Sequence, residues 1–142
     1  MPTRATKRGA QRTPLTRDCD VLICGASFAG LTLARELEGT GARVLVVDRY
    51  EIGERSTSAC AAPTDWLVRL GLGPSVRQTF GELVMHTAAS TVRWPLPFTF
   101  STFDYRTLCG LLREGAPSSE FETATVAGIE TGAMHVVHTD RG

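Results

Sequence analysis

The sequence of 142 residues lacks the features that mark a membrane or nucleic-acid-binding protein. No apolar run approaches the roughly 18 residues that a membrane-spanning helix needs. Lysine plus arginine and aspartate plus glutamate each number 15, so no net charge favours nucleic acid or an anionic membrane. With 42% hydrophobic and 21% charged residues, the composition is that of a soluble globular domain. We therefore expect a cytoplasmic protein with no transmembrane segment and no nucleic-acid partner.

Cysteine and histidine are sparse, and their spacing does not indicate a metal or a nucleophile. The four cysteines show no C-x-x-C spacing, and we expect reduced thiols, with Cys24 acting as a small apolar residue in a core strand. His135 and His138 fall in an expected strand, where residues three apart face opposite sides. We predict no metal site, and no serine–histidine–acid or cysteine–histidine arrangement identifies a catalytic residue.

Basic residues are concentrated at the start of the chain. Residues 1–17 contain five basic residues and no acidic one, which leaves ten basic and fifteen acidic residues in the remainder. This segment lacks the apolar centre of a secretory signal. We predict a disordered basic tail over residues 1–17 and one folded domain over residues 18–142.

The most informative segment runs from Asp20 to Asp48 and reads DVLICGASFAGLTLARELEGTGARVLVVD. It predicts a strand over residues 19–24 that is buried on both faces, a glycine turn, a helix over residues 27–38 and a second strand. Apolar residues in the helix have the spacing of one buried stripe: Leu31, Ala34 and Leu37.

The turn GASFAG has the spacing of a pyrophosphate-binding turn. Gly25 lets the chain reverse into the helix, and Gly30 lets the helix lie close to the strand. Free N–H groups and the helix dipole then favour an anion. Ser27 replaces the middle glycine of G-x-G-x-x-G and still offers an N–H and a hydroxyl. The candidate cofactor-binding residues of the turn are Gly25, Ala26, Ser27, Phe28, Ala29 and Gly30.

Asp48 ends the second strand at close to the separation of about 20 residues that a ribose-binding carboxylate requires. A carboxylate at this place accepts hydrogen bonds from two ribose hydroxyls and disfavours a 2′-phosphate, which argues against NADP at this site. Strand, glycine turn, helix, strand and acid together predict a dinucleotide site, to which we assign Asp48 and its neighbour Arg49.

The rest of the chain predicts a loop over residues 50–62 and a helix over residues 63–72. Strands follow over residues 82–86 and 91–94. The cluster WPLPFTF over residues 94–100 has two open interpretations: it walls a substrate or flavin pocket, or it is an aromatic loop that covers a sheet edge.

A helix over residues 104–114 and strands over residues 121–131 and 133–139 complete the expected elements. The final residues, Asp140 to Gly142, have the composition of a turn into a further strand. We therefore expect an incomplete sheet with an exposed edge, which a partner chain would cover.

These residues resemble the amino-terminal FAD-binding portion of flavin-dependent oxidoreductases of the aromatic hydroxylase and geranylgeranyl reductase type. The GASFAG turn with Asp48 and Arg49 carries the resemblance, and ERSTSACAAP, FDYRTLCGLL and ATVAGIE add weaker support. It implies FAD as cofactor and an α/β, Rossmann-like domain with a parallel sheet and an added β-rich segment. It also implies that Arg106 lies beside the cofactor and that the backbone of Val126 meets the adenine.

The complete proteins of this type are flavin-dependent monooxygenases or reductases that use NAD(P)H and hydrophobic small-molecule substrates. This chain lacks the later glycine-aspartate motif and the substrate domain, so we expect a truncated form, inactive alone. One alternative is a noncatalytic nucleotide-binding fragment or partner module. Another is an NAD-binding Rossmann domain, which the strand-rich segment after Phe80 disfavours.

Overall fold

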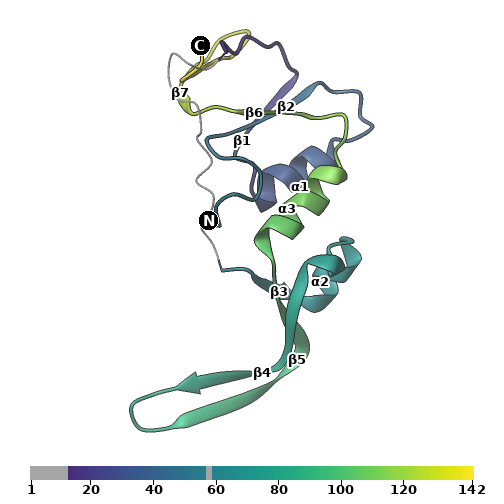
Figure 1. Cartoon of the computed structure of the whole chain (residues 1–142), viewed down its shortest axis with the longest axis vertical. Helices are drawn as coiled ribbons and strands as arrows, with labels where there is room; N and C mark the ends of the chain where they lie inside the picture. Colours follow the sequence, from purple (N-terminus) through teal and green to yellow (C-terminus); the bar gives the residue numbers. More distant parts are fainter. Residues whose placement is uncertain (1–12, 57–58) are drawn as a thin grey trace.

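The computed structural model describes residues 13–56 and 59–142 (Figure 1). Most of the predicted basic tail, residues 1–12, lies outside the described residues, as do positions 57–58 of the loop. Residues 13–15 run beside the last residues of the chain, because Leu15 N–H donates to the Arg141 carbonyl at 2.9 Å and Arg141 Nε donates to the Thr13 carbonyl at 2.9 Å.

Three parallel strands form the centre of the fold. They are β1 (Val21–Cys24), β2 (Val44–Asp48) and β6 (Glu120–Thr123), in the order β1-β2-β6. In β2, the four residues before Asp48 are all buried, because this strand has a neighbour on each side, helices over one face, and the pair β7 (Val126–Glu130) and β8 (Val136–Thr139) near the other. The predicted α/β class with a parallel sheet is confirmed.

Two helices, α1 (Phe28–Glu36) and α3 (Tyr105–Glu114), cover one face of this sheet (Figure 1). The predicted stripe of α1 is confirmed: Leu31 and Ala34 are fully buried, and Leu37 packs at its margin. These side chains form one apolar core with residues from β2 and α3, among them Val46, Leu108 and Leu112. The core therefore fixes α3 against α1, close to the glycine turn.

The opposite face of the sheet differs from the prediction that the first strand is buried on both faces. In β1, Ile23 is buried, but Cys24 is exposed. Leu22 and Cys24 face a hollow that is also lined by the antiparallel pair β7 (Val126–Glu130) and β8 (Val136–Thr139). An apolar run predicts a strand, but it does not tell whether a second layer covers the second face.

A second sheet lies between β2 and β6 in the chain and confirms the predicted β-rich segment. Its strands are β3 (Ala61–Pro63), β4 (Val76–His86) and β5 (Thr91–Phe103), antiparallel in the order β3-β5-β4. The helix α2 (Thr64–Arg69) and a 3-10 helix (Gly73–Ser75) precede β4. The hairpin of β4 and β5 extends away from the parallel sheet (Figure 1).

Two predicted segments take a different form. The cluster WPLPFTF is part of β5 and not a loop, because its apolar residues alternate along a strand that pairs with β4. The predicted strand over residues 121–131 is divided between β6 and β7, which belong to different sheets. The chain turns between β6 and β7 at Ala124, whose N–H donates to the Asp48 carbonyl at 2.8 Å. Among the described residues, no helix is long and apolar enough to span a membrane.

Candidate nucleotide-binding site

The glycine turn lies at the carboxyl end of β1, where ligands bind in open α/β sheets. Gly25 has a φ of +115°, which a side chain rarely adopts, and no atom lies within 4 Å of the place where its Cβ would be. Its N–H donates to the Val47 carbonyl at 2.7 Å, which ties the turn to β2. The turn is therefore anchored to the sheet and open on the side where Gly25 lacks a side chain.

Gly30 lies one turn into α1 and faces the same backbone. A Cβ at this position would be 1.8 Å from the Gly25 carbonyl oxygen and 3.1 Å from the Ile23 side chain. The absent side chain therefore lets α1 begin directly against β1, which is the packing role that the motif predicts for this glycine.

The start of α1 leaves backbone donors available. Leu31 N–H donates to the Ser27 carbonyl at 2.9 Å, and the N–H groups before it have no acceptor within the helix. Ser27 is the N-cap residue, but its side chain makes no capping hydrogen bond. The first turn of α1 thus presents the donors and the dipole that favour an anion.

Tyr105, which the sequence did not indicate, also belongs to this site. Its hydroxyl donates to Ser27 Oγ at 3.2 Å, and its ring packs edge-on against Phe28, with 5.3 Å between the ring centroids. Burial raises the pKa of the Tyr105 hydroxyl, which stays protonated as a donor. The two hydroxyls are 78 positions apart in the chain, so no local pattern could have identified this contact.

Asp48 joins the end of β2 to the glycine turn. Its Oδ2 accepts a hydrogen bond from Ala26 N–H at 2.8 Å, and its Oδ1 accepts one from Tyr50 N–H at 2.9 Å. The carboxylate is partly buried, and each oxygen keeps a second acceptor position. Asp48 is therefore a structural anchor of the turn as well as a candidate ribose ligand.

The other three candidate residues are less closely connected to the turn. Arg49 is exposed, and its guanidinium lies 5.3 Å from the centre of the Tyr50 ring. Arg106 is exposed in the first turn of α3, and its backbone lies against Gly53. A Cβ at Gly53 would be 2.9 Å from Arg106 Cα, so the loop after β2 reaches the start of α3. Val126 begins β7, in a different sheet.

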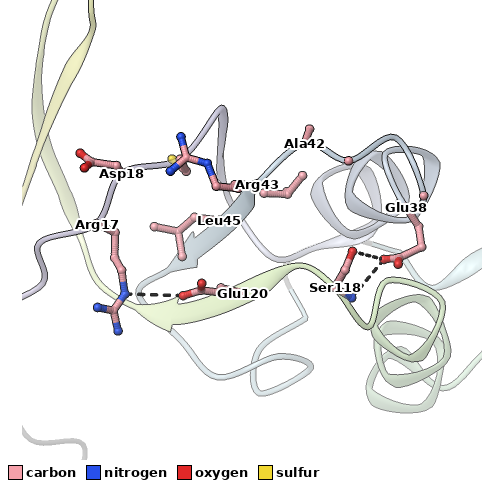
Figure 2. A pocket seen from close by; sticks show the side chains of 12 residues that line it. Arg17, Asp18, Glu38, Ala42, Arg43, Leu45, Ser118 and Glu120 are labelled. Carbon is pink, nitrogen blue, oxygen red and sulfur yellow. Dashed lines mark hydrogen bonds and ion pairs between the residues drawn. The ribbon is translucent and has the colours of Figure 1, made fainter.

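A separate hollow of about 450 Å³ lies at the opposite end of the parallel sheet (Figure 2). Arg17 pairs with Glu120 there at 3.5 Å, and Ser118 donates to Glu38. Nearby, the Arg43 guanidinium lowers the pKa of Asp20 to about 2. This hollow lies at the amino ends of the strands, away from the carboxyl ends where ligands bind in open α/β sheets, so we assign no ligand to it.

The family model described as an FAD binding domain matches residues 18–65. This range contains β1, the glycine turn, α1 and β2 with Asp48. The most informative segment of the sequence, Asp20 to Asp48, therefore lies within the residues that the family model matches. No curated protein sequence is significantly similar to the chain.

Solved flavoprotein structures share the fold. PqsL, a probable FAD-dependent monooxygenase from Pseudomonas aeruginosa, has a TM-score of 0.64 and 19% identity over 84% of this chain and 36% of its own. The halogenase PltM, solved with phloroglucinol and FAD, has a TM-score of 0.66 and 16% identity over 85% and 31%. A geranylgeranyl bacteriochlorophyll reductase-like protein from Thermoplasma acidophilum has a TM-score of 0.67 and 13% identity over 81% and 32%.

The chain spans about a third of the length of these solved structures. Together with the family match, their shared fold confirms the predicted resemblance to the amino-terminal FAD-binding portion of flavin-dependent monooxygenases and reductases. The match to an FAD binding domain indicates FAD as the cofactor of this domain.

Proposed function

We propose that the chain binds FAD at the carboxyl ends of β1 and β2 and forms the FAD-binding part of a flavin-dependent oxidoreductase. The observation that carries this proposal is the direct hydrogen bond between Ala26 N–H and the Asp48 carboxylate. It holds the phosphate-binding turn and the ribose-binding acid in one place, in a segment that matches an FAD binding domain.

The glycine turn fits the pyrophosphate of FAD. The open side of Gly25 gives a phosphate access to the backbone, and the first N–H groups of α1 are available to donate. Ser27 contributes its N–H, and its hydroxyl is oriented by Tyr105. Backbone N–H donors and the helix dipole would therefore bind the negatively charged pyrophosphate, without a basic side chain in the turn itself.

Asp48 fits the adenosine ribose. One acceptor position of each carboxylate oxygen is used by the backbone, at Ala26 and Tyr50, and a second position of each is left for a ribose hydroxyl. Because these backbone bonds fix the carboxylate before the cofactor arrives, little side-chain entropy is lost on binding. The negative charge also disfavours a nucleotide with a 2′-phosphate.

Three further residues belong to the proposed site on the strength of the family resemblance. Arg106 offers an exposed guanidinium at the start of α3, next to the loop that follows Asp48. Arg49 directly follows the acid, and Val126 would use its backbone against the adenine. The two arginine assignments can be tested by mutation without disturbing the turn, because neither side chain contacts it.

When bound, FAD would supply the redox chemistry of hydride and electron transfer. We assign to this chain the binding and orientation of the cofactor. A monooxygenase or reductase activity with NAD(P)H and a hydrophobic substrate is supported by the fold shared with PqsL and the reductase-like protein. We also propose a cytoplasmic location, because the four cysteines of the sequence show no C-x-x-C spacing and are expected as reduced thiols.

The proposal is tested by titrating the purified chain with FAD and following flavin fluorescence, with NAD as competitor. We expect saturable FAD binding that NAD does not displace at equal concentration. Asp48→Asn should weaken binding by about tenfold, or about 1.4 kcal/mol. Asp18→Asn is the matched control, because it removes an exposed charge at the amino end of the sheet and should leave affinity unchanged.

Circular dichroism of each variant separates a lost ligand from a lost fold, since Asp48 also anchors the turn. A folded wild-type chain that shows no saturable FAD binding would sink the proposal. Displacement of FAD by equimolar NAD would instead favour the NAD-binding dehydrogenase domain.

A noncatalytic FAD-binding module is the second candidate function. All residues that we assign to the proposed site bind or position the cofactor, which suits such a module. The module is distinguished from an oxidoreductase by adding NADH or NADPH to the FAD-loaded chain and following the absorbance of oxidised flavin. Bleaching faster than for free FAD supports the oxidoreductase, whereas binding without such reduction supports the module.

A further inference from the structure

Ser27, at the middle position of the GASFAG turn, is an N-cap residue whose side chain does not cap its helix. A serine at the N-cap ordinarily accepts a hydrogen bond from a backbone N–H two or three residues further on. In α1 the Ser27 side chain makes no such bond, although its backbone is extended as at an N-cap, with φ −102° and ψ −166°. The N–H groups of the first turn therefore stay available, and the Ser27 hydroxyl serves another partner.

That partner is Tyr105, the first residue of α3, whose hydroxyl donates to Ser27 Oγ at 3.2 Å. A phenol is a stronger acid than an aliphatic alcohol, so the tyrosine is the better donor of these two hydroxyls. Among the described residues, Ser27 Oγ makes no hydrogen bond besides this one. A serine hydroxyl also carries one proton of its own, so the Ser27 proton is left to donate to a ligand.

A small aromatic cluster holds the Tyr105 ring in this position. The ring packs edge-on against Phe28, with 5.3 Å between the centroids, and Phe28 packs in the same way against Phe103 at 5.5 Å. Phe28 is the first residue of α1, so the cluster joins the starts of α1 and α3. These contacts are made by the rings and not by the hydroxyl. Tyr105→Phe should therefore keep the packing and remove only the hydrogen bond.

The Ser27 hydroxyl belongs to the same helix start as the backbone donors of the proposed pyrophosphate site. Ser27 directly precedes α1, whose first N–H groups have no acceptor within the helix. A hydrogen bond to a phosphate oxygen is charge-assisted and about twice as strong as one between neutral groups. A hydroxyl that accepts one hydrogen bond is also polarised as a donor of the next. Ser27 therefore offers a polarised side-chain donor at a position where the glycine of G-x-G-x-x-G has none.

We propose that Tyr105 is a positioning residue for the diphosphate of FAD: it donates to Ser27 Oγ and thereby commits the Ser27 proton to a phosphate oxygen. This inference rests on the proposed function and adds to it the group that the hydroxyl pair recognises, which is the diphosphate and not the ribose or the adenine. Tyr105 acts through Ser27, and both hydroxyls are neutral. The pair therefore contributes a directed donor to the turn without adding a charge.

The test is a double-mutant cycle of Ser27→Ala and Tyr105→Phe, in which the affinity of the purified full chain for FAD is measured by flavin fluorescence. Ser27→Ala removes a hydrogen bond to a charged group and should weaken binding by about tenfold. Tyr105→Phe removes a bond between neutral groups and should weaken binding by about threefold. In the Ser27→Ala background, Tyr105→Phe should have no further effect, because its acceptor is already absent.

Competition against FAD by ADP and by adenosine shows which part of the cofactor the hydroxyl pair recognises, because only ADP carries a diphosphate. Each substitution should weaken ADP binding as it weakens FAD binding and should leave adenosine binding unchanged. A contact that merely ties α3 to the turn would weaken both competitors alike. Ser118→Ala is the matched control, because it removes a serine hydroxyl that donates to Glu38 at 2.8 Å at the opposite end of the sheet. It should leave all three affinities unchanged.

An optical titration gives a second measure that does not depend on the folding of Tyr105→Phe. In a Tyr50→Phe background, Tyr105 is the one remaining tyrosine, and its ionisation is followed by ultraviolet absorbance. Because the bound diphosphate requires the phenol proton, ADP should raise the pKa of Tyr105 and adenosine should not.

The outcomes separate this inference from the proposed function. Additive effects of the two substitutions in a chain that binds FAD, or equal losses of ADP and adenosine binding, overturn the role of Tyr105 alone. The same conclusion follows if ADP leaves the pKa of Tyr105 unchanged. A folded wild-type chain that binds neither FAD nor ADP overturns the proposed function and this inference together.

Discussion

At the scale of single residues, the candidate site depends on the absent side chains of Gly25 and Gly30 as much as on the carboxylate of Asp48. Gly25 permits a backbone conformation with positive φ, and Gly30 removes a side chain that would collide with that same residue. Asp48 then fixes Ala26 through a hydrogen bond. Each of these residues shapes the turn before any cofactor binds, so mutations here should affect stability and affinity together.

Gly30→Ala should destabilise the chain by about 1–3 kcal/mol, the usual cost of overpacking a close contact. The added Cβ would meet the Gly25 carbonyl oxygen at 1.8 Å, so α1 must move away from β1. The measurement is urea denaturation followed by circular dichroism, together with FAD affinity, which should also fall.

Gly110→Ala in α3 is the matched control for this substitution. No atom outside its own helix lies within 4 Å of a Cβ at that position, so the change should stabilise the helix by about 0.5–1 kcal/mol. Equal effects of the two substitutions would contradict the packing role of Gly30.

At the scale of secondary-structure elements, α3 connects the site to the rest of the fold. Its N-cap residue is Asp104, whose carboxylate accepts hydrogen bonds from Thr107 N–H and the Thr107 hydroxyl, both at 2.8 Å. Arg77 on β4 pairs with the same carboxylate at 3.0 Å. The cap therefore fixes the start of the helix, where Tyr105 meets Ser27.

The thermal stability of the chain should fall as pH decreases from about 4 to about 2. The hydrogen bonds from Thr107 and the nearby Arg77 lower the pKa of Asp104 from its ordinary 3.8 to about 2. A lowered folded-state pKa contributes stability that is complete above the ordinary pKa and is lost as pH falls through the folded value. Thermal melting across this range measures the effect.

Asp104→Asn keeps a capping side chain and removes the charge, so its melting temperature should lie below that of the wild type near neutral pH. The difference should close as pH approaches 2. Asp65→Asn in α2 is the control, because its pair with Arg69 is exposed and 3.8 Å long and contributes little. Parallel melting curves for the wild type and Asp104→Asn at all pH values would contradict this role.

At the scale of the whole molecule, two parts have different tasks. The parallel sheet with α1 and α3 contains the core and the candidate FAD site, whereas the β4–β5 hairpin carries exposed apolar residues, among them Leu83 and Trp94, away from that core (Figure 1). The chain corresponds to about a third of the similar flavoproteins, and the hairpin is the part that lacks a covering layer among the described residues.

Hydrogen exchange of the backbone should respond to FAD in only one of these parts. FAD should slow exchange at residues 25–31 and 48–53, because their N–H groups lie at the proposed site. Exchange at residues 82–95 of the hairpin should stay unchanged, because the hairpin extends away from the proposed site (Figure 1). Protection by FAD that is confined to the hairpin would place the cofactor elsewhere and contradict the proposed site.

The sequence alone determined the β1–turn–α1–β2 unit, because glycine positions, helical periodicity and an acid at a fixed separation are local properties. It also determined that the unit suits FAD, and the family match confirms this. The strand character of WPLPFTF was missed, because prolines are read as loop signals unless the strand edge that they face is known.

Only the tertiary structure decided which distant residues meet. The contact of Tyr105 with Ser27 exists because α1 and α3 pack together on one face of the sheet. The exposure of Cys24, and of Leu83 and Trp94 on the hairpin, was likewise decided by which layers lie over which faces. Local pattern specifies which side of an element is apolar, but packing against other elements determines whether that side is buried.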